Sequence, residues 1–201
     1  MIRTVFFLLS LFSLSAQAVT LPELQQRFNQ QPVLRADFSQ QRQISGMSLP
    51  LNSSGNLLIA QKKGLWWQQK KPFLLTLLLT ENRMVQTMSG QPSQGITADS
   101  NPQMFQFNAL LMALFQADQQ ALEHNFALNF SDKGQGAWQL ILTPKTAPLN
   151  RLFHTITLNG QEYLNLIDIK DMQGDETHIR FYNQRTEPAA LTDAELAHFD
   201  R

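Results

Sequence analysis

The residues that could perform acid–base or metal chemistry lie scattered through this chain of 201 residues. No two of its four histidines stand at metal-ligand spacing, and the sequence contains no HExxH, GxSxG, P-loop or GxGxxG motif. It contains no cysteine, which excludes disulfides, thiolate metal sites and a cysteine nucleophile. Asp168, Asp171, Asp175 and Glu176 cluster around one turn, but turns favour acidic residues and the spacing of a calcium-binding loop is missing. We therefore expect neither an enzyme active site nor a metal or cofactor.

Apolar side chains, by contrast, are in excess on the strands in the middle of the chain. Leu57, Ile59, Leu65 and Trp67 alternate along two expected strands, so one face of the sheet is wholly apolar there. The opposite face also carries apolar residues, although an antiparallel sheet in water normally keeps one face polar. The residues that we expect on the hollow side of the sheet are Phe38, Leu57, Ile59, Leu65, Trp67, Leu75, Leu77, Met84, Met104, Phe107 and Leu111.

This apolar surplus has two interpretations. In the first, these side chains pack together as an ordinary core, with the helices filling the concave side of the sheet. In the second, part of the concave face remains a cavity for an alkyl chain. Each buried CH₂ contributes about 0.8 kcal/mol, so a chain of about 16 carbons would contribute on the order of 12 kcal/mol. The methionines suit such a site because a flexible thioether adapts to irregular shapes.

The first part of the chain predicts a helix followed by the strands that carry these residues. Thr20 and Glu23 form a capping-box pattern that starts a short helix, and Pro32 ends it. The alternation from Val33 to Ile44 predicts a half-buried first strand with Arg35 on its polar side. The next strands are expected at Asn56–Ala60, Leu65–Gln69, Phe73–Thr80 and Met84–Met88.

The rest of the chain predicts a loop, a helix and a meander. Ser89–Asn101 lacks periodicity and is expected to form a surface loop or flap. From Pro102 follows a helix that is apolar nearly all round, either a buried core helix or a lid over a cavity. From Phe126 onward, hairpin-connected strands alternate with turns, and Thr192 begins a last capped helix. We expect a mainly β (α+β) fold with one curved antiparallel sheet of about ten strands and two or three short helices.

The N-terminus has the pattern of a secretory signal peptide. Arg3 precedes the apolar segment Val5–Leu14, and a small-x-small site ends at Ala18, where we expect cleavage. A membrane anchor would need about 20 apolar residues. Residues 19–201 would then form one domain with 15 basic and 16 acidic residues, a balance that gives no basic field for nucleic acid or anionic lipid. This pattern indicates a soluble protein of a bacterial envelope.

Several short motifs resemble one known family. Taken in order, they are Ala36-Asp37-Phe38-Ser39-Gln40, Gly55-Asn56-Leu57, Leu65-Trp66-Trp67 with Pro72, Leu77 to Arg83, Leu142-Thr143-Pro144-Lys145, and Gly174 to Thr177 with Ile179 and Phe181. Their order and spacing resemble the LolA-like periplasmic carriers of outer-membrane lipoproteins, over nearly the whole mature chain. The resemblance implies a half-open antiparallel β-barrel with a short helical lid over an apolar cavity. It also implies that Leu65 and Trp67 face that cavity.

One family position differs in this sequence. The arginine that holds the lid by hydrogen bonds in the family falls at Gln61, followed by Lys62 in place of a proline. An amide can hydrogen-bond, but it cannot make the charge-assisted contacts of a guanidinium. The difference leaves open whether the protein serves the general lipoprotein pathway or carries another lipid-linked product.

The functional expectation is a carrier in the periplasm of a Gram-negative bacterium. The resemblance implies a monomer that shields the acyl chains of a lipoprotein or another lipid-linked product in its cavity. Such a carrier would take its cargo from an inner-membrane donor protein and pass it to an outer-membrane acceptor. The alternative is an envelope sensor or docking module that uses the same half-barrel to bind another protein.

Overall fold

The computed structural model describes residues 18–81, 83–89, 91–97 and 112–200. Nearly all of the expected signal peptide lies outside these residues, as do Met104, Phe107 and Leu111 of the expected cavity. In the described part of the chain, no helix is long and apolar enough to cross a membrane.

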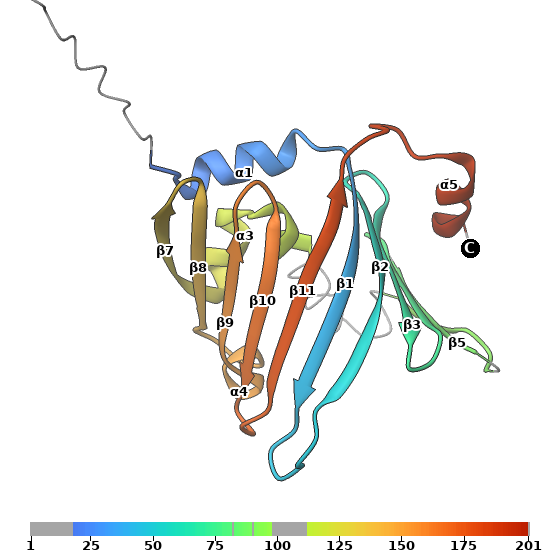
Figure 1. Ribbon diagram of the computed structural model, residues 1–201, viewed down its shortest axis with the longest axis horizontal. Helices are drawn as coiled ribbons and strands as arrows, with labels where there is room; N and C mark the ends of the chain where they lie inside the picture. The colour runs from blue at the N-terminus through green and yellow to red at the C-terminus, as the bar shows by residue number, and fades with distance from the viewer. Residues whose placement is uncertain (1–17, 82, 90, 98–111, 201) are drawn as a thin grey trace, which may run out of the picture.

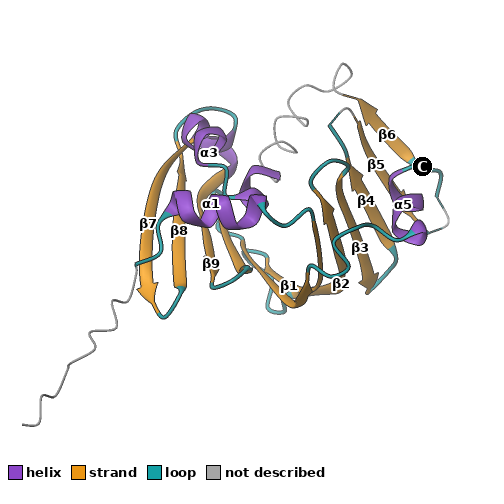
Figure 2. Ribbon diagram, turned by 90° about the horizontal axis from the view of Figure 1, so that it is seen from above, coloured by secondary structure: helices purple, strands orange, loops and turns teal. Residues whose placement is uncertain are grey.

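The described residues form one antiparallel sheet of eleven strands, in the order β6-β5-β4-β3-β2-β1-β11-β10-β9-β8-β7. The sheet is strongly curved but open, with β6 and β7 at its edges, and short helices α1 and α3 lie in its hollow (Figures 1 and 2). The strands are β1 (Val33–Gln43), β2 (Leu51–Ala60), β3 (Gly64–Lys71), β4 (Leu75–Leu79), β5 (Arg83–Met88), β6 (Gln94–Thr97), β7 (Phe126–Gly134), β8 (Ala137–Pro144), β9 (Phe153–Gly160), β10 (Leu164–Asp171) and β11 (Glu176–Arg185). The helices are α1 (Leu21–Asn29), α3 (Gln119–Asn125), α4 (Leu149–Leu152) and α5 (Asp193–Phe199), and residues 112–116 are also helical. An open half-barrel of mainly β structure is therefore confirmed.

The capping boxes predicted at both ends of the chain are present. The Thr20 hydroxyl accepts from the Glu23 amide and the Glu23 carboxylate accepts from the Thr20 amide, and Thr192 and Glu195 do the same at α5. Several predicted boundaries differ from the observed ones. β2 begins at Leu51 rather than Asn56, and β3 runs from Gly64 to Lys71 rather than from Leu65 to Gln69. β4 begins at Leu75 rather than Phe73, because the tip around Pro72, which has no N–H to donate, bends out of the ladder. The segment predicted to be irregular contains the short edge strand β6.

The concave face of the sheet carries the main core. The ladder places Phe38 beside Phe181, and Leu57 beside Trp67, which is in turn opposite Leu77. The rings of Phe38 and Trp67 are in contact, with centroids 3.9 Å apart. The period-two alternation therefore puts the predicted residues of these strands on one face, as expected for a twisted sheet.

The apolar residues on the opposite, convex face are covered by the C-terminal helix. Phe199 of α5 joins Val33, Leu58, Ala60 and Leu78 in a second buried cluster. The indole of Trp66 also stacks on the imidazole of His198, with centroids 4.1 Å apart. The apolar surplus on this face thus has a partner within the chain and implies no ligand.

Arg35 is buried beneath the segment that leads to α5, where the strand pattern predicted a polar, solvent-facing position. Its guanidinium donates to both carboxylate oxygens of Glu195, at 2.5 and 2.8 Å, and to the carbonyls of Pro188 and Ala190. This pair fixes the end of the chain across the outside of the half-barrel. The prediction failed here because the partners are 153 to 160 positions away in the sequence.

Candidate functional site

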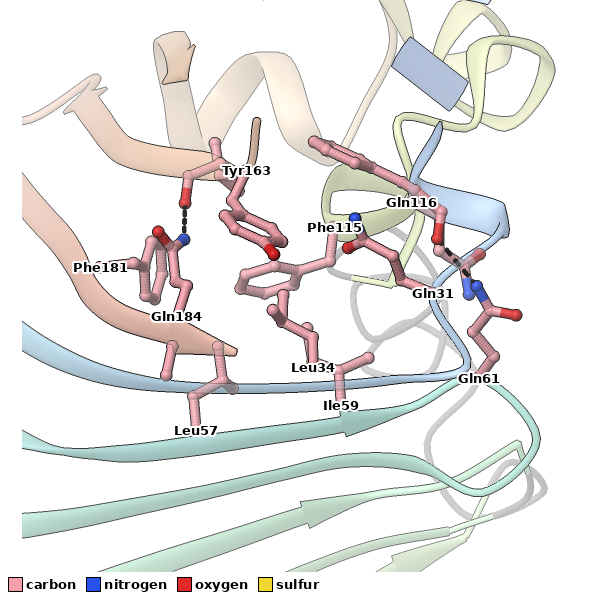
Figure 3. A pocket seen from close by; sticks show the side chains of 13 residues that line it. Gln31, Leu34, Leu57, Ile59, Gln61, Phe115, Gln116, Tyr163, Phe181 and Gln184 are labelled. Carbon is pink, nitrogen blue, oxygen red and sulfur yellow. Dashed lines mark hydrogen bonds between the residues drawn. The ribbon is translucent and has the colours of Figure 1, made fainter. Parts of the chain in front are cut away.

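A pocket lies on the concave side, between the sheet and the helices that cross its hollow. Its floor comes from β1, β2 and β11, and its cover from the end of α1 and the helical segment 112–116 (Figure 3). None of the described residues that line it is charged. They are Phe28, Gln31, Leu34, Ala36, Leu57, Ile59, Gln61, Phe115, Gln116, Tyr163, Leu164, Phe181 and Gln184.

The ring of Phe115 reaches into this pocket from the cover. It packs edge-on against Phe181 of the floor, with centroids 5.5 Å apart. The helical segment ends one residue later, at Gln116; Ala117 then takes a positive φ of 48° and Asp118 caps α3. The remaining cavity volume is about 20 Å³, which is room for about one water molecule. An acyl chain can enter this pocket only if Phe115 moves out.

The predicted cavity residues divide into several groups. Leu57 and Ile59 line the pocket, whereas Phe38, Leu65 and Met84 are buried in the core cluster around it. Trp67 and Leu77 are half-buried against that cluster, and Leu75 is half-buried one register position further along the same face.

The predicted cavity set missed most of the cover and most of the floor. Leu34 and Ala36 were in the alternation of the first strand but were not included in the cavity set. Gln184 had no signal at all, because a bulge places Asn183 and Gln184 opposite Ala36 alone. Asn183 has a φ of 53°, which turns the chain so that Gln184 lines the pocket.

The pocket is bordered by neutral amides. Gln184 donates to the carbonyl of Leu164 at 2.5 Å, and Gln31 and Gln116 lie at the cover. Gln61, the expected lid position, donates from Nε2 to the carbonyl of Phe28 in the last turn of α1, at 3.0 Å. Burial raises the pKa of the Tyr163 phenol, so this hydroxyl stays neutral. The border can offer hydrogen bonds but no ionic attraction.

The amide of Gln61 gives a first testable prediction. Replacing it with methionine, which is similar in length but cannot donate, is expected to lower the free energy of unfolding by about 1 kcal/mol. Because the lost bond holds the end of α1, the amides of α1 should also exchange faster with deuterium. Gln69→Met is the matched control, since the Gln69 amide bonds only to the exposed turn at Phe73. Equal exchange of α1 in both variants would show that Gln61 does not hold this helix.

The acidic cluster around the β10–β11 turn has partners of its own. Asp175 accepts from the Ser45 amide at 2.9 Å and from Arg42 at 2.8 Å, and these bonds, the first above all, hold the pKa of its carboxyl below the usual value. Asp168 pairs with His178 at 2.5 Å. Within the described ranges, no group of three or more His, Asp or Glu side chains is arranged to hold a metal ion.

Comparison with known proteins places the chain in a family. The model of a family described as outer membrane lipoprotein carrier protein LolA-like matches residues 13–199. No curated relative matches this sequence.

Several solved structures are similar to this chain at low identity. A LolA superfamily protein from Nitrosomonas europaea is 9% identical with a TM-score of 0.47, over 88% of this chain and 97% of that chain. A putative outer membrane lipoprotein-sorting protein domain from Vibrio parahaemolyticus is 10% identical with a TM-score of 0.47, over 89% and 97% of the two chains. MucB is 12% identical with a TM-score of 0.49, over 87% and 62%, and the MucA/MucB complex of Pseudomonas aeruginosa is also similar. Because the family model spans nearly the whole chain, this protein belongs to the LolA-like family of outer membrane lipoprotein carrier proteins.

Proposed function

We propose that this protein is a non-enzymatic periplasmic carrier that shields the acyl chains of a lipoprotein or another lipid-linked product. The observation that carries the proposal is the pocket itself: an apolar floor on the concave face, over which the ring of Phe115 lies on a short helical segment. A side chain in that position can be exchanged for another apolar group of similar size. If a second sheet covered the floor instead, a ligand could not take its place without unfolding the protein.

The energetics of such an exchange are favourable. The wall formed by β3 and β4 continues the floor with Trp67 and Leu77, which are only half-buried. A chain of about 16 carbons that lies along this face would contribute on the order of 12 kcal/mol. Part of this binding free energy is offset by the cost of displacing Phe115 and the helical segment that carries it. The remainder suits a carrier, which must hold its cargo in water and still release it.

The amide border suits the polar end of such a cargo. Gln31 and Gln116 lie beside the apolar floor, where the ester or amide links of an acylated molecule would leave the pocket. These side chains can donate to carbonyl oxygens without selecting for charge. Delivery would involve a donor protein at the inner membrane and an acceptor at the outer membrane.

The proposal predicts that a charge on the half-buried wall blocks binding. Leu77→Glu is expected to weaken the binding of a fluorescent fatty acid or an acylated peptide at least tenfold, because the carboxylate would be desolvated by the chain. Leu77 is preferable to Leu65 for this test, because Leu65 is fully buried and a charge there would unfold the protein. The measurement is a fluorescence titration, with circular dichroism to verify the fold.

Val85→Glu provides the matched control. Val85 is also half-buried, on the neighbouring strand, but it faces the convex cluster. It should lose a similar amount of stability and keep its affinity for the chain. Equal loss of binding in both variants would refute a cargo site on the concave face. Mass spectrometry of organic extracts from protein isolated from its own periplasm tests the sensor alternative, which requires that no lipid co-purifies.

A further inference from the structure

The large apolar side chains that are exposed in this protein gather at one end of the sheet. Leu49 is the most exposed, at 74%, and lies with Met47 and Leu51 on the β1–β2 hairpin. Phe73 and Leu74 are about half exposed at the tip between β3 and β4. Each of these connections lies at the end of the strands away from α1, at the bottom of Figure 1.

Two more exposed apolar residues continue this surface. Leu152 ends α4 and Met172 lies in the β10–β11 turn, and the Met172 amide donates to the Leu152 carbonyl at 3.0 Å. The same turn is joined to the β1–β2 hairpin by the bond from the Ser45 amide to Asp175. We call these seven residues the apolar end. Only Tyr182, on the convex side of β11, is a large exposed hydrophobic residue elsewhere in the described chain.

Cations without an acidic partner flank the apolar end. Lys70 and Lys71 directly precede the tip that carries Phe73, and Arg151 precedes Leu152. Among the ion pairs of the described residues, none involves these three side chains.

One carboxylate at this end, that of Asp171, has no cationic partner among the ion pairs of the described residues and accepts from the backbone amides of Gln173 and Asp175. The three unpaired cations outnumber it, and the two carboxylates that follow it in the same turn are paired. Asp175 pairs with Arg42, and Glu176 pairs with Lys170 at 3.2 Å. The overall charge of the chain is balanced, but the fold brings unpaired positive charge to this end. The sequence alone indicated no attraction to anionic lipid, because net charge does not show how charges are distributed.

We propose that the apolar end docks this protein onto the surface of a bilayer that contains anionic phospholipid. The apolar side chains stand on or beside separate connections at one end of the sheet, which suits insertion between lipid headgroups better than packing against a folded partner. Lys70, Lys71 and Arg151 would then lie at the level of the lipid phosphates. The docking surface lies on the loops, apart from the pocket, so this inference does not depend on the cargo proposal.

Vesicle sedimentation with the cargo-free protein tests this proposal. Wild-type protein should bind vesicles of phosphatidylethanolamine and phosphatidylglycerol, and it should bind phosphatidylcholine vesicles far more weakly. Leu49→Ser is expected to lower the partition coefficient about tenfold, because it removes one inserted side chain. Lys70→Glu with Lys71→Glu should lower it at least tenfold and reduce its dependence on salt.

Tyr182→Ser is the control, because Tyr182 is also exposed, at 42%, but lies outside the apolar end. It should leave vesicle binding unchanged, and all variants should keep the circular dichroism spectrum and the thermal midpoint of the wild-type protein. The proposal is overturned if wild-type protein does not bind anionic vesicles, or if Leu49→Ser and Tyr182→Ser bind alike. It is also overturned if sedimentation shows a dimer that Leu49→Ser dissociates, since the surface would then join two copies of the chain.

Discussion

Replacing Phe115 with alanine is expected to weaken the fold and, at the same time, to strengthen acyl-chain binding about tenfold. The two effects have one cause, because the ring now occupies the space that a chain would take. Phe115 is 9% exposed and packs on Phe181 across a cavity of about 20 Å³. Without the ring, the apolar floor at Leu57 and Ile59 would be open to a ligand.

The magnitude follows from known truncations. A buried phenylalanine that is replaced by alanine costs about 3–5 kcal/mol, and a site at the border of a pocket belongs at the lower end of that range. Apolar cavities created in this way stay dry and bind apolar ligands. In the wild-type protein the ligand must first displace the ring, and that cost is removed in the variant. Added fatty acid should therefore restore much of the lost thermal stability.

Phe199→Ala is the control for this experiment. Phe199 is buried to the same degree, at 6% exposed, but fills the convex cluster under α5. Its loss should cost similar stability and leave fatty-acid affinity unchanged. Calorimetric titration and thermal unfolding, with and without fatty acid, measure both effects. If Phe115→Ala weakens binding, the ring is part of the binding surface and does not act as a plug.

The concave face could be predicted from the sequence because it depends on local alternation. Leu57 and Trp67 alternate with their neighbours, and the side-chain period of two holds wherever the ladder is regular. The rule gives no information on Gln184, because a bulge changes the register there. Strand alternation does not apply to Phe115, which lies on a helical segment. Because that segment is apolar nearly all round, its sequence does not reveal which face meets the sheet.

The charged residues were harder to predict than the apolar ones. Arg35 was expected on a polar face because it alternates with Leu34 and Ala36. Its burial depends on a segment from the opposite end of the chain, which carries Glu195. Single-sequence patterns describe a residue's own strand and contain no information about what later folds over it.

Removing the carboxylate of Glu195 is expected to lower the free energy of unfolding by about 3 kcal/mol at pH 7. The Arg35 guanidinium, with the Thr192 amide and hydroxyl, holds the pKa of Glu195 at about 2, against 4.5 for the ordinary side chain. A difference of that size corresponds to about 3 kcal/mol. In Glu195→Gln, Arg35, which is 5% exposed, would keep only its carbonyl partners and the neutral amide.

The dependence on pH separates this ion pair from simple loss of packing. A carboxyl whose pKa is lowered by folding contributes its full stability above the unfolded value of 4.5 and loses it as the pH falls toward 2. Wild-type protein and Glu195→Gln should therefore differ at pH 7 and converge in urea unfolding as the pH approaches 2. Glu176→Gln is the control, since its pair with Lys170 is exposed and should contribute less than about 1 kcal/mol. A difference between wild type and Glu195→Gln that persists unchanged at low pH would mean that shape, and not charge, holds the C-terminal segment across β1.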